Sequence, residues 1–338
     1  MITQKEIAKR LNVSQALVSR VLGGTADRIG VALDTAERIR DLAVRLDYRP
    51  SAAAQSLRGG PSLTLGVIVK EFGDPFFGQM IAELRGVAHL ARYSIVLASY
   101  DPDAGEAEDV NSLLRYRVDK IVLCGSNFPA ALVRRFVAGG ARVVQIGMGP
   151  APRGVSLVSV DEAFGLERLI AHLKQLGHRE IGFLGNAAAA NRRREETVRR
   201  LLSAAALRIR PEWCVSVAAK AAEAGHLAVN RLLSTTRRLP TALVAADDMT
   251  ALGAMRALHE KGMTVPGDFS VTGFDDVPFA ALSVPGLTTV RQPIRDMVRV
   301  ACALLNDSEP RKVAPPCLVR PELIIRESGA APRRRNAT

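Results

Sequence analysis

From Leu63 onward the chain alternates short, continuous apolar runs with amphipathic stretches, and this pattern limits the possible folds more than any other. Continuous apolar runs are typical of parallel strands buried on both faces, and an apolar period near 3.6 residues is typical of helices covering them. Two series of four runs predict two doubly wound α/β lobes with parallel sheets and a cleft between the carboxyl ends of their strands. The first series is 63–69, 94–99, 120–124 and 142–147, with helices near 76–91, 105–116 and 129–138; the second is 180–185, 213–218, 242–247 and 269–274.

Length and composition indicate a globular chain with more than one domain. At 338 residues and 48% hydrophobic residues it can bury several cores, and no apolar run approaches the roughly 20 residues of a membrane span. The N-terminal stretch MITQKEIAKRL is charged and does not resemble a secretory signal, so we expect a cytoplasmic protein. The four cysteines lie far apart without a CxxC pair, which predicts reduced thiols and neither a metal site nor a cofactor.

The formal net charge of +12 suggests a polyanionic partner, because clustered Lys and Arg release counterions when they neutralise phosphates. Residues 1–60 carry a net charge of +4, and the rest of the excess is spread along the body and the tail GAAPRRRNAT. We expect this tail to be disordered, with solubility and DNA contact as equally plausible roles.

The first 48 residues contain three helical patterns and no strand-like run, so a separate domain is expected to end near Pro61. Thr3 and Glu6 match a capping box at the start of the first helix. Asn12 begins a tight turn, and Ser14 caps a second helix that ends at a Gly-Gly pair. Two short helices joined by so small a turn predict a helix-turn-helix.

The free face of the second helix carries Gln15, Ala16, Ser19 and Arg20. Arg can bind guanine O6 and N7, Gln can pair with adenine, and Ala can contact a thymine methyl. Short hydroxyls such as those of Ser14 and Ser19 suit phosphates. Taken alone, this pattern more often belongs to an ordinary solvated surface than to a nucleic-acid interface.

Ordered motifs over almost the whole chain make it resemble the lactose/galactose repressor (LacI–GalR) family. The N-terminal part supplies TQKEIAKRLNVSQALVSRVLGG, a third helix closing in LDYRP, and the hinge-helix segment AAAQSLR. The body supplies DPFFGQM (74–80), LGHREIGFLG (176–185), LPTALVAADD (239–248), ALGAMRAL (251–258), VPGDFSVTGFDDVP (265–278) and LTTVRQP (287–293).

The resemblance assigns a DNA-binding set to the N-terminal part. Leu57 matches the hinge leucine that the family inserts into the minor groove at the centre of a palindromic operator, although a core residue of a short helix is the simpler interpretation. Two departures, Ser51 in place of Asn and Ala32 in place of a capping Ser, each remove a contact. The expected DNA-binding residues are Thr3, Ser14, Gln15, Ala16, Ser19, Arg20 and Leu57.

The resemblance also places ligand-binding positions in the cleft. Phe76 and Phe77 match aromatic stacking positions, with a helix core role as the alternative. Arg194 aligns best with a ligand-binding arginine, with Arg192 and Arg193 as competing choices. The full expected set is Phe76, Phe77, Ser126, Asp161, Arg194, Lys220, Asp247 and Asp275.

The ligand class follows from the charges in this set. Lys220, whose register is uncertain by a residue or two, would together with Arg194 favour a carboxylate or phosphate. Asp275 and Asp247, the latter standing where many relatives have Asn, favour hydroxyls. We therefore expect a sugar, sugar acid or sugar phosphate, while an exposed lysine without a role remains an equal alternative.

The resemblance implies a regulator that binds double-stranded palindromic operator DNA as a homodimer, without a membrane, in a bacterial cytoplasm and associated with the nucleoid. The alternatives are a sugar-modifying enzyme, against which stand the missing GxxxxGK[ST] and GxGxxG motifs, and a pure sugar-binding protein. No leucine heptad follows the core, which argues against a coiled-coil tetramer. The expected parts are a headpiece (1–48), a hinge (49–61), a first lobe (62–160 and 291–318), a second lobe (161–290 and 319–329) and a basic tail (330–338).

Overall fold

The computed structural model divides the chain into two compact units, Met1–Leu63 and Thr64–Thr338. The described residues are 2–23, 30–48, 63–100, 108–115, 118–149, 151–307 and 316–333. No helix among them is long and apolar enough to cross a membrane.

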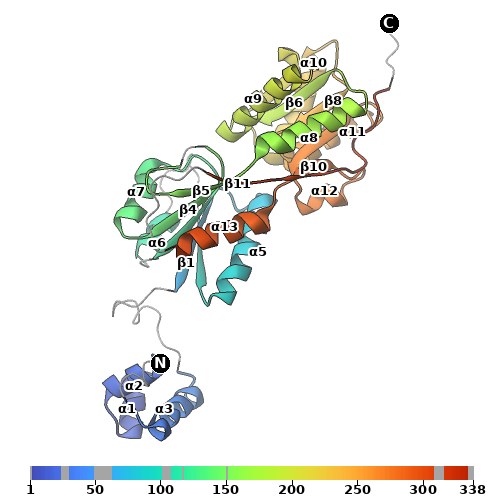
Figure 1. The fold of residues 1–338 in the computed structure, drawn as a ribbon. Coiled ribbons are helices and arrows are strands. Elements are labelled where there is room, and N and C mark those ends of the chain that lie inside the picture. Colours follow the sequence, from blue (N-terminus) through green and yellow to red (C-terminus); the bar gives the residue numbers. More distant parts are fainter. Residues whose placement is uncertain are drawn as a thin grey trace. The chain divides into compact units, whose positions relative to one another are not determined.

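The first unit contains three short helices around a small apolar core (Figure 1). Apolar residues three or four positions apart give each helix one buried stripe, and the three stripes meet. The helices are α1 (Gln4–Leu11), α2 (Gln15–Leu22) and α3 (Leu33–Arg45). The buried side chains are Ile7, Ala8, Val18, Val21, Ala36, Ile39 and Ala43.

The first lobe of the second unit is built on a six-stranded sheet in the order β11-β5-β4-β3-β1-β2, in which all pairings are parallel. The central strands are buried on both faces, which explains their continuous apolar sequence. The strands are β1 (Thr64–Val69), β2 (Ser94–Ser99), β3 (Lys120–Cys124), β4 (Arg142–Ile146), β5 (Ser156–Val160) and β11 (Cys317–Val319). The helices are α5 (Pro75–Leu90), α6 (Glu108–Arg115), α7 (Ala130–Ala138) and α13 (Ile294–Asn306).

The second lobe repeats this plan with the order β12-β10-β9-β8-β6-β7, where only β12 is antiparallel to its neighbour. The strands are β6 (Ile181–Asn186), β7 (Cys214–Val217), β8 (Ala242–Ala245), β9 (Ser270–Asp275), β10 (Thr288–Arg291) and β12 (Glu322–Ile324). The helices are α8 (Glu162–Gln175), α9 (Ala189–Ala204), α10 (Ala221–Thr235), α11 (Asp248–Glu260), α12 (Pro278–Leu282) and the 3-10 turn η2 (Pro211–Trp213).

Helices α10 and α11 pack backbone to backbone. A Cβ on Gly225 would lie 1.8 Å from the carbonyl oxygen of Thr250, and one on Gly253 would lie 1.8 Å from that of Ala222. Only glycine permits this approach, so these two residues fix the position of α11, whose first turn borders the cleft.

The chain passes between the lobes three times, after β5, β10 and β11. Helix α13 follows a strand of the second sheet but packs on α5, β4 and β5 of the first lobe, beside which it lies in Figure 1. Three connections therefore join the two lobes, each at the end of a strand, where hinge residues are commonly found.

The sequence prediction of two parallel α/β lobes is confirmed, but it missed β5, β10, β11 and β12. Strands β11 and β12 have three residues each at sheet edges, and β10 has four, two of them threonine. In β10, β11 and β12 the apolar residues are too few to stand out as a run, and the serines of β5 interrupt its apolar sequence.

The first residues of the expected disordered tail, 330–333, make contacts with the second lobe, and residues 334–338 lie outside the described residues. The backbone of Ala330 bonds to His178 and Ser270, and Arg333 lies 3.8 Å from Asp268. His178 is fully buried, and burial lowers its pKa. The backbone of Ala330 therefore holds this segment to the second lobe, because the buried side chains of His178 and Ser270 require hydrogen-bond partners.

Candidate functional site

Helices α1 and α2 form the predicted helix-turn-helix. The Thr3 hydroxyl accepts a hydrogen bond from the Glu6 amide at 3.3 Å, and the Ser14 hydroxyl accepts one from the Leu17 amide at 3.1 Å. Asn12 ends α1 in the left-handed conformation, with φ of 53°, a region that Asn tolerates better than most residues. Both caps and the turn agree with the sequence prediction. The Glu6 carboxylate pairs with Arg10 at 3.1 Å and so does not complete the predicted capping box.

The face of α2 opposite its buried residues exposes Gln15, Ala16 and Arg20, and it leaves Ser19 half-buried. Val18 and Val21 fix the rotation of the helix because both are buried in the core. The residues expected to contact base edges therefore lie together on one accessible surface, which a helix entering a major groove requires.

Ala32 and Ser51 are the two positions at which this unit departs from the family pattern, and the structure describes only Ala32. Ala32 occupies the N-cap of α3 without a side-chain hydrogen bond, so the cap that a serine would form is missing. Leu57 and Ser51 lie outside the described residues.

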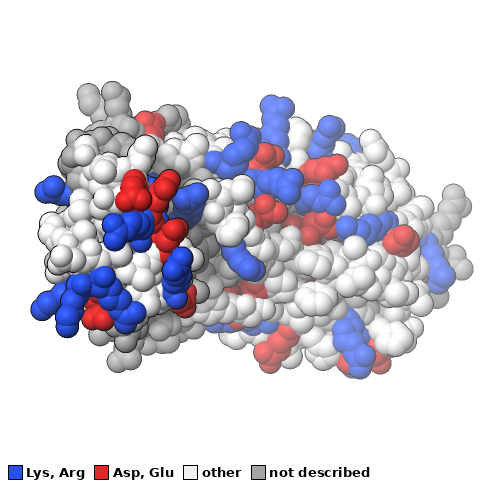
Figure 2. Space-filling model, turned by 90° about the horizontal axis from the view of Figure 1, so that it is seen from below, with Lys and Arg blue, Asp and Glu red and all other residues white. Residues whose placement is uncertain are grey.

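Charge alone does not single out a nucleic-acid surface. Figure 2 shows Lys and Arg side chains interspersed with Asp and Glu on the visible face. Since both signs are mixed there, the case for DNA contact depends on the helix-turn-helix geometry.

A cavity of about 740 Å³ lies between the two lobes of the second unit. Its walls are the segments that follow the carboxyl ends of the strands, as predicted for doubly wound sheets. The first lobe contributes residues after β1, β3 and β4, and the second contributes residues after β6, β7, β8 and β9. Seven of the eight expected residues line it: Phe76, Phe77, Ser126, Arg194, Lys220, Asp247 and Asp275.

The eighth residue, Asp161, is not among those lining the cavity. Its carboxylate caps α8 by accepting a hydrogen bond from the Phe164 amide at 3.1 Å. Its amide donates to the Val319 carbonyl at 2.8 Å, where two connections between the lobes run together. The side chain therefore serves the start of a helix at the lobe crossing, because the orphan amides there need an acceptor.

Phe76 and Phe77 begin α5 with their ring centroids 5.4 Å apart in an edge-to-face arrangement. Both rings also pack against the large core cluster. Both positions considered for them, in the helix core and at the ligand cavity, are therefore occupied at once. Each half-buried residue packs on the core and also borders the cavity.

Arg194 is the arginine that reaches the cavity, and neither Arg192 nor Arg193 lines it. Its Nε donates to Glu162 and its Nη1 to the Ala246 carbonyl. Its guanidinium carbon lies 3.8 Å from the centroid of the Phe274 ring. Burial lowers the pKa of Arg194, but the charges of Glu162, Asp275 and Asp247 together raise it above its ordinary value, so the group stays protonated.

Asp275 ends β9 with φ of 118° and is 9% exposed. Its Oδ1 accepts a hydrogen bond from the Gln292 side chain at 2.6 Å. Burial raises the pKa of Asp275 well above its ordinary value, against the lowering effect of Arg194. Gln292 comes from the connection after β10, so the lobe crossing helps to hold this carboxylate.

Asp247 and Ser126 each line the cavity while making a hydrogen bond within the chain. Asp247 caps α11 through the Thr250 amide at 2.7 Å, and the Ser126 hydroxyl accepts from the Met148 amide at 2.8 Å. Lys220 is exposed at the N-cap of α10, where it has no side-chain capping bond. Asp247 is therefore positioned by a local helix cap, and Ser126 by a contact between the segments that follow β3 and β4.

Asp74 lines the cavity but was absent from the expected set. Its Oδ1 accepts a hydrogen bond from the Phe76 amide at 2.9 Å at the start of α5. Burial raises the pKa of Asp74 to about 6. An Asp before Pro at a helix start after a strand is a recognisable sign of an N-cap at a strand end, and it could have been used to find this residue.

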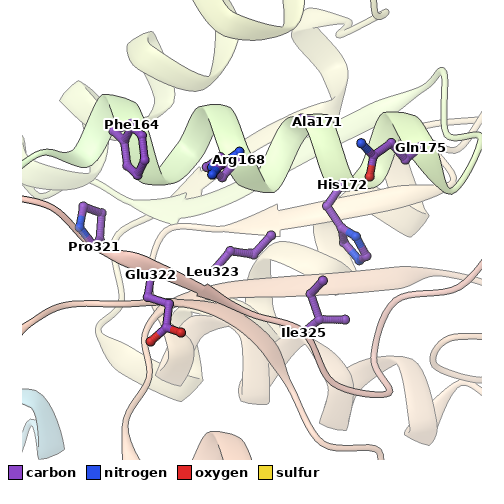
Figure 3. A pocket seen from close by; sticks show the side chains of 9 residues that line it. All are labelled: Phe164, Arg168, Ala171, His172, Gln175, Pro321, Glu322, Leu323 and Ile325. Carbon is purple, nitrogen blue, oxygen red and sulfur yellow. The ribbon is translucent and has the colours of Figure 1, made fainter.

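A second hollow of about 370 Å³ lies between α8 and β12 (Figure 3). It shares no lining residue with the large cavity and contains none of the expected ligand residues.

The comparisons with known proteins decide the family. A family model described as a periplasmic binding protein-like domain matches residues 170–329. The HTH-type transcriptional repressor PurR of Haemophilus influenzae (strain PittEE) is 32% identical over 97% of this chain and 98% of its own length. The chain belongs to the LacI–GalR family.

Further relatives agree with this membership. The HTH-type transcriptional regulator GalS of Salmonella typhimurium is 32% identical over 90% of this chain and 89% of its own length. The Lac repressor dimer bound to operator and the anti-inducer ONPF is 25% identical with a TM-score of 0.84, covering 98% of this chain and 99% of that chain. This LacI–GalR member is thus a DNA-binding transcriptional regulator and not an enzyme, and the non-regulatory alternative has no support.

Proposed function

We propose that this LacI–GalR member is a homodimeric repressor that binds a palindromic operator and responds to a small sugar-like effector in the interlobe cavity. The observation that carries the proposal is the exposed Gln15, Ala16 and Arg20 face of a capped helix-turn-helix on a chain that also holds a 740 Å³ cavity between two lobes. A cavity of this size can hold a sugar or a similarly sized molecule.

The related Lac repressor supports both halves of the proposal. One of its structures is a dimer bound to operator and the anti-inducer ONPF, and another is bound to ONPG in the repressed state. By the same reasoning we place this regulator in a bacterial cytoplasm, associated with the nucleoid through its operators. Binding of effector would shift the population between two lobe arrangements and so change operator affinity.

The proposed roles within the chain follow the expected parts. Residues 1–48 would form the DNA-binding headpiece and residues 49–61 the hinge, with Leu57 as a minor-groove wedge. Gln15, Ala16 and Arg20 would contact bases, while Thr3, Ser14 and Ser19 would contact phosphates. Both capping hydroxyls use their oxygen as an acceptor, which leaves their O–H able to donate to a phosphate.

Operator binding is tested with Arg20→Ala in the full-length protein. If Arg20 contacts a base, the operator affinity falls by about 1–3 kcal/mol, while binding to unrelated DNA falls much less. Arg256→Ala is the matched control, because it removes one exposed arginine from the second lobe. Equal losses for operator and unrelated DNA would show that Arg20 contacts only the backbone, and no loss would remove it from the interface.

The effector site is tested with Asp275→Ala. The variant should keep operator binding and lose the change in operator affinity that an effector causes, since this carboxylate is held in the cavity by Gln292. An unchanged effector response would remove Asp275 from the proposed site.

A further inference from the structure

The hollow of about 370 Å³ between α8 and β12 has one helical wall and one wall from the sheet (Figure 3). The helical wall consists of residues at positions i, i+3, i+4 and i+7, which share one face of a helix: Arg168, Ala171, His172 and Gln175. Opposite them lie Leu323 and Ile325, which are two positions apart and therefore point to the same side of the strand. Ile325 is 60% exposed although it is large and apolar.

Two features of α8 leave this space open. Near its first turn the helix lies close to the sheet, because a Cβ on Gly165 would be 2.6 Å from Cγ1 of Val290 and 2.8 Å from Cγ of Pro321. Further along the helix, Ala171 has only a methyl group where a larger side chain would fill the hollow. A molecule placed there would have Ala171 on one side and Leu323 on the other, so a flat apolar body fits.

Positive charge without a carboxylate partner lies at one end of the hollow. The guanidinium carbons of Arg168 and Arg320 are 5.5 and 5.2 Å from the centroid of the Phe164 ring, which lines the hollow. Neither arginine forms an ion pair among the residues that the structure describes. Glu322 also lines the hollow, but it pairs with Arg291 at 3.2 Å and its carboxylate points away from α8 in Figure 3. This end of the hollow therefore attracts an anion.

His172 adds an unsatisfied polar atom to the same wall. Its Nε2 is buried and has no hydrogen-bond partner within the described ranges of the chain. Burial lowers the pKa of His172, so its ring is neutral at pH 7. Buried polar atoms in native proteins are nearly always paired, so this nitrogen calls for a partner that the described residues do not supply.

We propose that the hollow between α8 and β12 is a second ligand site, which binds a small aromatic carboxylate. The ring of this ligand lies between Ala171 and the pair Leu323 and Ile325, and its carboxylate lies toward Arg168, beside Phe164. A guanidinium can donate two parallel hydrogen bonds to a carboxylate, which a neutral ligand cannot match. The proposal is independent of the effector cavity, because the two sites share no lining residue.

Calorimetry and thermal shift on the full-length protein at pH 7 test the ligand class. The probes are benzoate and indole-3-acetate, each compared with its neutral amide, benzamide or indole-3-acetamide, and acetate represents an anion without a ring. We expect at least one aromatic carboxylate to bind with a Kd of about 1 mM or below. It should bind roughly fivefold more tightly than its amide, since an exposed charge pair contributes up to about this factor. Acetate should not bind at the same concentration.

Two variants locate the binding. Arg168→Gln removes the charge and should abolish most of the preference for the carboxylate over its amide. Ala171→Phe fills the hollow from an exposed position and should weaken the binding of both probes by about fivefold or more. Arg200→Gln is the matched control, because Arg200 is exposed on α9 and does not line the hollow, and it should leave both affinities unchanged.

Three results would overturn the proposal. Neither aromatic carboxylate could bind, or the amides could bind as tightly as the carboxylates. Alternatively, Arg168→Gln could keep the full preference for the carboxylate, which would place the probe elsewhere in the protein. Operator binding and melting temperature measured on the same samples show whether each variant is folded, and Arg168→Gln alone decides the question if Ala171→Phe is not.

Discussion

The buried pair of Arg194 and Glu162 allows a quantitative test of how the second lobe is held together. Their side chains are 8% and 5% exposed, and Arg194 also donates to the Ala246 carbonyl and stacks on Phe274. Arg194→Met fills similar space without the charge and leaves Glu162 buried without its cation. Removing one partner of a buried ion pair costs about 3–5 kcal/mol.

The double variant Arg194→Met/Glu162→Gln should recover much of that loss. Replacing both charges of a buried pair by groups of similar volume is often close to neutral, although here the Ala246 carbonyl still loses a donor at about 1–3 kcal/mol. If Glu162→Gln alone costs about 3 kcal/mol as well, the double variant should be several kcal/mol more stable than the sum of the single variants predicts.

Urea unfolding followed by tryptophan fluorescence measures this lobe specifically. Trp213 is the only tryptophan of the chain, is fully buried in the second lobe, and donates to the Arg238 carbonyl at 2.7 Å. Arg199→Met on the same helix is the control, because Arg199 and Glu195 form an i,i+4 pair with side chains 36% and 19% exposed, and such helix pairs contribute about 0.3–0.5 kcal/mol.

Two results would refute this reasoning. Arg194→Met could cost no more than Arg199→Met, which would mean that Glu162 is easily solvated once its partner is gone. Alternatively, the losses of the two single variants could add fully in the double variant, which would mean that the two side chains stabilise the lobe independently.

Three further predictions concern other parts of the chain. The native pKa of Asp74, about 6, exceeds its unfolded value of 3.8, so the native state binds more protons between these pH values and the stability of the protein falls as pH rises through this window. Asp74→Asn should remove roughly 1–3 kcal/mol of this loss of stability. Melting temperatures that fall equally steeply from pH 4 to 7 in both proteins would contradict this prediction. Ala32→Ser should stabilise the first unit by about 1 kcal/mol by capping α3, as measured by its thermal unfolding, and an unchanged or lower midpoint would exclude the cap. Leu57→Ala should weaken operator binding more than binding to unrelated DNA in a titration, whereas parallel losses would exclude a minor-groove wedge.

The local features of the first unit could be predicted because neighbouring residues determine them. The caps by Thr3 and Ser14, the turn at Asn12 and the exposure of Arg20 all follow from contacts within a few positions and from helical periodicity. The alternation of apolar runs likewise determined two parallel sheets and the edge at which the cavity lies.

The composition of the cavity depended on tertiary structure. Asp161 stands at a strand end like the other expected residues, but its side chain caps α8 instead of lining the cavity. Arg194 was expected to supply a free cation, and its engagement by Glu162 could not be foreseen because the two residues lie on different helices.

The sequence by itself determined most of the helices, eight of the twelve strands that the structure describes, and which side chains are available at the ends of those strands. Only the tertiary structure decided which of those side chains line the cavity and which are engaged elsewhere in the chain. Asp74, Asp247 and Asp275 line one cavity because strands from two lobes end there, and Arg194, which also lines it, is held by Glu162 because a buried cation needs a nearby anion. The net charge offered to a ligand is therefore a property of long-range packing, which no local pattern records.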